Sequence, residues 1–166
     1  TLRPKKVERL RVTFKIPYNE NADIQHKIRL IAKIGDYDHM VSMMTIVNVN
    51  IKEKPAFQLE AYKEIDEVFI NKKNSIEFLI RNIGNVTDSY NITSTIPKNW
   101  ELVDSPEIIE IPPDSSHHFE LKIIPPKKPK KISGEQLTIQ ASSALIKSYS
   151  GIWHKTIDSK DGYCSD

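Results

Sequence analysis

Apolar and polar residues alternate in short runs along most of this chain. The runs Leu10–Ile16, Ile28–Ile34 and Phe119–Ile123 place apolar side chains at every second position. Because successive side chains of a strand point to opposite faces, this period predicts β-strands with one buried face. Glycine and proline turns separate the runs, and no stretch has a convincing helical period. The sequence therefore predicts an all-β protein, an immunoglobulin-like antiparallel β-sandwich.

A glycine turn over residues 82–88 joins two of these runs near the middle of the chain. In the run that follows it, alternation predicts that Tyr90 and Ile92 face inward and that Asn91 and Thr93 face solvent. The same pattern predicts seven or eight short strands between residues 53 and 157.

The chain also resembles itself at one constant offset, the one that places Leu10 on Phe119. The matches include two prolines and need no gap. A shared apolar pattern with prolines in the same places indicates two copies of one structural unit. The matched pairs are Leu2/Ile111, Pro4/Pro113, Leu10/Phe119, Val12/Leu121, Phe14/Ile123, Pro17/Pro126, Ile28/Leu137, Leu30/Ile139 and Ala32/Ala141.

This repeat predicts three parts. Residues 1–52 are expected to be the last three strands of a first, partial module, residues 53–157 a complete module, and residues 158–166 a polar tail. The charged, proline-ended run of residues 52–55 marks the boundary. Three amphipathic strands alone expose an apolar face and free edges, which water disfavours. Residues 1–52 should therefore pack on the second module, on strands that precede them, or on another copy of the chain.

The composition of the chain excludes only some classes of function. The 166 residues carry 24 Lys and Arg against 22 Asp and Glu, a net charge of +2 that is too small to favour nucleic-acid binding. The one cysteine, Cys164, allows no intrachain disulfide. The apolar stretches are far shorter than the roughly 20 residues that span a bilayer, so no membrane insertion by this segment is expected.

Two patterns resemble metal or catalytic sites, but neither meets the chemical requirements. His117 and His118 are adjacent, so on a strand they point to opposite faces and cannot bind one ion together. Residues 158–162 read Asp-Ser-Lys-Asp-Gly, with a lysine among the oxygen ligands that a calcium loop needs. An intact small hydrolase would need an acid or nucleophile beside a histidine, and none can be assembled. The sequence predicts no catalytic residue, no metal site, no cofactor and no enzymatic activity.

Two features are candidates for surface chemistry. A proline-stiffened loop could bind a polyanion such as an acidic glycan, an anionic lipid surface or nucleic acid, or it could simply be solvated. Its lysines are Lys127, Lys128, Lys130 and Lys131. No aromatic residue interleaves with them to stack on bases. Asn85 and Asn91 each begin an Asn-x-Ser/Thr sequon, and both are predicted to be exposed N-glycosylation sites.

The two tryptophans have two interpretations. Trp100 and Trp153 could be ligand platforms, as in carbohydrate-binding modules, or anchors of the core. Their apolar neighbours favour burial between the sheets.

Residues 57–145 resemble the bacterial and archaeal NEW3/CARDB-type immunoglobulin-like modules. The matching features are Asn82-Ile83-Gly84-Asn85 with Asp88 and Tyr90, Pro97 with Trp100, Ile111-Pro112-Pro113 with Ser115 or Ser116, Pro125-Pro126, and residues 134–141. The chain departs from the family at Asn99 and Asp114, where such modules usually have glycine. These modules occur in cell-surface proteins and beside glycosidases and share no catalytic residues, so the resemblance implies a spacer, adhesion or accessory domain.

Two functions remain open from sequence. The first is a non-catalytic module, extracellular or on the cell envelope, that acts as a spacer, an adhesion domain or a protein or glycan interaction domain, as S-layer-like tandem repeats do. The second is an accessory domain of a polysaccharide-active enzyme whose catalytic domain lies outside this chain. The expected partners are other protein domains or surface glycans, and self-association through residues 1–52 is an alternative.

Overall fold

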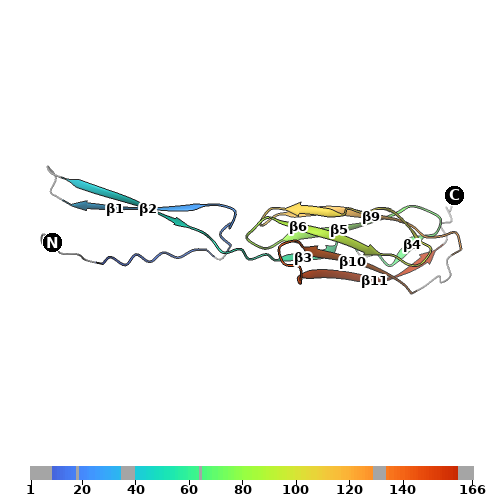
Figure 1. Ribbon diagram of the computed structural model, residues 1–166. Coiled ribbons are helices and arrows are strands. Elements are labelled where there is room, and N and C mark those ends of the chain that lie inside the picture. The colour runs from blue at the N-terminus through green and yellow to red at the C-terminus, as the bar shows by residue number, and fades with distance from the viewer. Residues whose placement is uncertain (1–8, 18, 35–39, 64, 129–133, 161–166) are drawn as a thin grey trace.

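The computed structural model describes residues 9–17, 19–34, 40–63, 65–128 and 134–160. These residues form eleven β-strands and no helix. A hairpin of β1 (His26–Ile34) and β2 (Val41–Val49) stands beyond a sandwich of nine strands, β3 to β11 (Figure 1). The predicted all-β, immunoglobulin-like sandwich is confirmed, with nine strands where seven or eight were expected. Among the described residues no helix is long and apolar enough to cross a membrane.

The sandwich has two sheets of mainly antiparallel strands. The five-stranded sheet has the order β4 (Glu67–Phe69), β11 (Ser150–Lys160), β10 (Glu135–Ser143), β6 (Asp88–Thr95) and β8 (Ile108–Ile111). The four-stranded sheet has the order β3 (Phe57–Ala61), β5 (Asn74–Asn82), β9 (Ser116–Ile124) and β7 (Glu101–Asp104). Neighbouring strands among the described residues pair antiparallel, except that β4 and β11 are parallel.

One apolar core fills the space between the two sheets. Alternate side chains of the central strands are fully buried there, as the sequence pattern predicted: Ile76, Phe78 and Ile80 of β5, Leu121 and Ile123 of β9, Tyr90 of β6, and Leu137, Ile139 and Ala141 of β10. Each such large side chain stabilises the fold by about 1.5–3 kcal/mol. Asn91 and Thr93 are exposed, which also agrees with the prediction.

Both tryptophans belong to this core. Trp100 is buried, and the partly buried Trp153 packs against the core with its ring edge-on to Phe78 at 5.0 Å between centroids. Phe78 also stacks on Phe119 at 5.3 Å. The interpretation of the tryptophans as core anchors is therefore favoured over ligand platforms.

Three residues other than glycine have left-handed backbones among the described residues: Asn71, Asn99 and Asp114. Asn99 has a φ of 72° and Asp114 a φ of 54°, and these are the two positions where the resembled modules usually have glycine. Asn and Asp tolerate this conformation better than other residues with a Cβ atom, because their short polar side chains bond locally. The turns therefore form without glycine.

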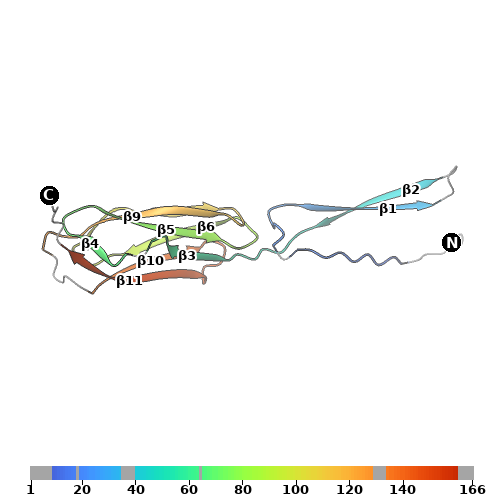
Figure 2. The same ribbon diagram turned by 180° about the vertical axis from the view of Figure 1, so that it is seen from behind.

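One predicted strand does not form. Residues 9–16 are exposed and belong to no sheet. A strand must share its N–H and C=O groups with a neighbour, and among the described residues no strand pairs with this segment. Strands β1 and β2 also stand clear of the sandwich in both views (Figures 1 and 2), so the apolar face of the hairpin does not pack on the second module.

The last strand of the module extends beyond residue 158, where the polar tail was predicted to begin. Strand β11 continues to Lys160, and its residues from Asp158 onward pair in parallel with Glu67–Phe69 of β4. Ser159 is buried there, although its neighbours in sequence are polar and exposed. Pairing with β4, which comes early in the sequence of the module, keeps these residues in the sheet. Residues 161–166 lie outside the described residues.

Candidate functional site at the neck

The turn between β5 and β6 is held by a buried asparagine. The Nδ2 of Asn82 donates to the carbonyl oxygens of Val86, at 2.9 Å, and of Ile111, at 2.8 Å. Its Oδ1 accepts from the Gly84 N–H at 2.9 Å. Asn82 is fully buried, so these bonds both satisfy its amide and fix the turn against β8. The turn then presents residues 83–87 to the hairpin side of the sandwich.

The linker from the hairpin lies directly on this turn. A Cβ atom on Gly84 would lie 2.6 Å from the Lys54 carbonyl oxygen and 2.7 Å from the Ala56 nitrogen. The Ile83 N–H also donates to the Ala56 carbonyl at 2.9 Å. Gly84 is therefore required by the close approach of another backbone, which no side chain would allow.

Asn85 bonds to both chain segments that connect the hairpin to the sandwich. Its Oδ1 accepts from the Lys54 N–H at 2.6 Å, and its Nδ2 donates to the carbonyl oxygens of Glu20, at 3.0 Å, and Lys52, at 3.1 Å. Its backbone carbonyl accepts from the Ala22 N–H at 2.7 Å. We call these contacts, made by residues 20–26 and 50–56 with residues 82–87, the neck.

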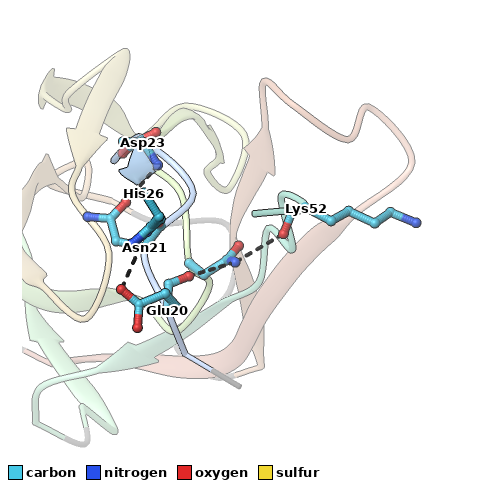
Figure 3. Close-up of polar contacts among 6 residues, drawn as sticks. Glu20, Asn21, Asp23, His26 and Lys52 are labelled. Carbon is cyan, nitrogen blue, oxygen red and sulfur yellow. Dashed lines mark hydrogen bonds and ion pairs between the residues drawn. The ribbon is translucent and has the colours of Figure 1, made fainter. Parts of the chain in front are cut away.

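A second bond pair closes the neck on its other side. The Thr87 N–H and Oγ1 both donate to the Asp23 carboxylate, at 3.0 and 2.7 Å. The Asp23 N–H in turn donates to Asn21 Oδ1 at 2.8 Å. His26 Nε2 lies 3.4 Å from Glu20 Oε1 at the base of β1. Figure 3 shows Glu20, Asn21, Asp23 and His26 gathered where the hairpin begins.

The neck buries one of the two predicted glycosylation sites, Asn85, whereas the other, Asn91, stays exposed. Asn85 was expected to be an exposed glycosylation site, but only 3% of it is exposed and its Nδ2 already donates two hydrogen bonds. The predicted exposure of Asn85 is wrong because the turn, although polar, is covered by segments distant in sequence. Asn91 is exposed on β6, where it pairs with Ile108 and Ser142. The sequon at Asn91 is the accessible one.

The lysine loop lies at the end of the sandwich opposite the neck. Lys127 and Lys128 are exposed, and they follow β9, which begins near the neck and ends at Ile124. The Asn71 N–H donates to the Pro125 carbonyl at 2.9 Å, which places this loop beside the start of β5. Lys130 and Lys131 lie outside the described residues.

The two adjacent histidines lie on the surface of the sandwich. His117 and His118 are both exposed on β9, and the ring of His118 lies edge-on to Tyr62 at 4.9 Å. Within the part of the chain that the structure describes, no three His, Cys, Asp or Glu side chains are grouped to hold a metal ion.

A buried polar pair was not anticipated from sequence. The Asp88 carboxylate accepts from Ser143 Oγ at 2.5 Å and from the Leu145 N–H at 3.4 Å, and the Ile146 N–H donates to Ser143 Oγ at 3.0 Å. These bonds hold the loop between β10 and β11. Beside them, burial and the nearby Asp88 charge raise the pKa of Tyr90. The side chains of Asp88 and Ser143 are both buried, and their hydrogen bonds fix this loop to the start of β6.

The solved structures that are similar to this chain include two of one bacterial protein. One is Escherichia coli alpha-2-macroglobulin activated by porcine elastase, at 13% identity and a TM-score of 0.49, covering 85% of this chain and 12% of that chain. The other is the native conformation of the same E. coli protein, at 17% identity and a TM-score of 0.47, covering 83% of this chain and 8% of that one. This chain thus spans a small fraction of either protein. No protein-family model and no curated protein matches it.

Proposed function

We propose that this chain is a non-catalytic spacer module, which holds the parts of a larger cell-surface protein on either side of it at a fixed separation and orientation. The observation that carries the proposal is the neck. Asn85 joins both connecting segments to the sandwich through hydrogen bonds to Glu20, Ala22, Lys52 and Lys54. A flexible tether would need no such contacts.

The path of the chain through the sandwich supports this role. The chain enters at Phe57, whose ring packs on Tyr149 just before β11 begins, with 5.1 Å between centroids. Strand β11 then runs the length of the module to Lys160, about 3.3 Å per residue, or roughly 35 Å. Entry and exit are therefore at opposite ends of the sandwich (Figure 1). This is the geometry that separates two neighbours.

The cell-surface location is part of the proposal. The exposed sequon at Asn91 and the resemblance to surface modules support it. The partners in this view are the adjoining domains of the same protein, and surface glycans are the further candidates.

The test is whether the neck is rigid. Replacing Asn85 with Ala removes three side-chain hydrogen bonds, each contributing about 0.5–1.5 kcal/mol, and we expect the hairpin then to move independently of the sandwich. Backbone ¹⁵N relaxation measures this: in the unchanged protein, amides of β1–β2 and of the sandwich should report one rotational correlation time, and in Asn85→Ala the hairpin value should fall.

Asn91→Ala is the matched control, because it removes an exposed asparagine from the neighbouring strand and should leave the relaxation unchanged. Independent tumbling of the hairpin in the unchanged protein would refute the spacer role.

A further inference from the structure

The β1–β2 hairpin has one apolar face on which no strand packs among the described residues, although Ile28 and Leu30 near its base are half-buried. Its register pairs Ile28 with Val47, Ala32 with Met43 and Ile34 with Val41, so these side chains share one face. Met43 is 76% exposed and Val41 is 71% exposed. The opposite face carries Lys27, Arg29 and Lys33 together with Ile31, Ser42, Met44, Ile46 and Asn48.

This hairpin corresponds to β10 and β11 of the complete module. The constant offset of the internal repeat carries both ends of β1 onto the ends of β10, and the first residue of β2 onto the first residue of β11. The apolar face residues Ile28, Leu30 and Ala32 correspond to Leu137, Ile139 and Ala141, which are fully buried. The registers differ by one residue across the loop, since Ile28 pairs with Val47 whereas Leu137 pairs with Lys155.

The exposed segment of residues 9–16 corresponds to β9 in the same way. The same offset matches its Leu10, Val12 and Phe14 with Phe119, Leu121 and Ile123, which are buried. In the complete module β9 belongs to one sheet and β10–β11 to the other. Figures 1 and 2 likewise show this segment running along the hairpin without joining its sheet. A crevice of about 300 Å³ between Phe14, Ile16, Ile28 and Val49 marks where the two converge at the neck.

The complete module shows what such strands require. There β9 lies beside β5, and β10 lies beside β6. The side chains Ile76, Phe78, Ile80, Tyr90 and Ile92 of β5 and β6 fill the core against β9 and β10. In the first unit, the described residues include no strands equivalent to β5 and β6.

We propose that the apolar face of β1–β2 and residues 9–16 is the docking surface for a pair of amphipathic strands equivalent to β5 and β6, which completes a second sandwich. In the order of the fold these strands precede the segment of residues 9–16, because β5 and β6 precede β9. A second copy of this chain fits less well, since its free hairpin offers strands of the β10–β11 type. This inference does not depend on the spacer role, whose test at Asn85 leaves the face unchanged.

Hydrogen exchange measured by mass spectrometry tests the proposal. The 166-residue chain is compared with a chain extended by its natural preceding residues, and the amides of β1 and β2 are followed in both. We expect protection of these amides to rise at least tenfold in the extended chain only. In that chain, Leu30→Asp on the apolar face should abolish the gain, whereas Ile31→Asp on the opposite face should leave it.

Equal exchange in the two chains would overturn the proposal. So would protection in the 166-residue chain that grows with protein concentration, since this outcome, checked by sedimentation velocity, would assign the face to a second copy.

Discussion

Several single residues of this module are important because they lie where two backbone segments contact each other. Gly84 and Asn85 lie under the linker, and Asn82 ties their turn to β8. Each of these residues looks like an ordinary turn former in the sequence. Their positions matter because the contacting backbone atoms belong to segments that are distant along the chain, such as Glu20 and Lys52.

Tyr90 offers a test of core energetics. Its hydroxyl is buried with no hydrogen-bond partner among the described residues, so Tyr90→Phe should raise the free energy of unfolding by about 1 kcal/mol. Because the pKa of Tyr90 is raised in the folded state, its phenol ionises first in the unfolded chain, so the free energy of unfolding falls as the pH rises above the unfolded pKa near 10 and is unaffected below it. Urea unfolding at pH 7 and pH 10.5 measures both effects.

The gain from Tyr90→Phe should be larger at pH 10.5, since the variant has no phenol to ionise. A decrease in stability at pH 7 would show that the hydroxyl has a partner, such as a buried water. Tyr62→Phe, at an exposed tyrosine, is the control.

At the scale of elements, the sequence predicts strands well when both neighbours are present. Strands β5, β9 and β10 follow the alternation because each is paired on both sides and has one face in the core. Residues 9–16 have an equally clear pattern but no partner among the described residues, so they form no strand. Ser159 shows the opposite relation between sequence and structure. It is buried because β11 pairs in parallel with β4, but a polar serine gives no sign of burial in the sequence.

The neck could be predicted only in part. The linker at residues 52–55 and the glycine turn were both evident in the sequence, but their contact was not. Polar turn residues are usually exposed, and only the return of a distant segment makes Asn85 an exception.

The lysine loop is the element with a testable affinity. Changing Lys127, Lys128, Lys130 and Lys131 to Gln should abolish salt-sensitive retention on a heparin column, because each lysine that pairs with a sulfate releases counterions on binding. Lys98→Gln with Lys147→Gln, at two other exposed lysines, should leave elution unchanged. Unaltered elution of the fourfold variant would identify the loop as a solvated connection only.

The whole molecule is elongated, with the sandwich at one end and the hairpin, whose apolar face is exposed, at the other (Figure 1). The sandwich buries its apolar strand faces between two sheets, whereas the hairpin exposes side chains of the same kind. The proposed surface location belongs to this scale, because it concerns the environment in which the protein works.

That location predicts a specific modification. In protein isolated from its native source, intact mass should show one N-linked glycan, attached at Asn91, and Asn91→Gln should remove it. Asn85→Gln should change no glycan mass, since Asn85 is enclosed in the folded protein. A glycan at Asn85 would mean that the neck closes only after modification or not at all.

The long strand β11 has one more consequence. It begins beside the neck and leaves the module along its own direction, bonded to β10 over most of its length and to β4 at its end. Hydrogen bonds between strands run across the strand direction. Tension applied between the two ends of the module therefore loads many of these hydrogen bonds in shear at the same time. It does not open them one after another.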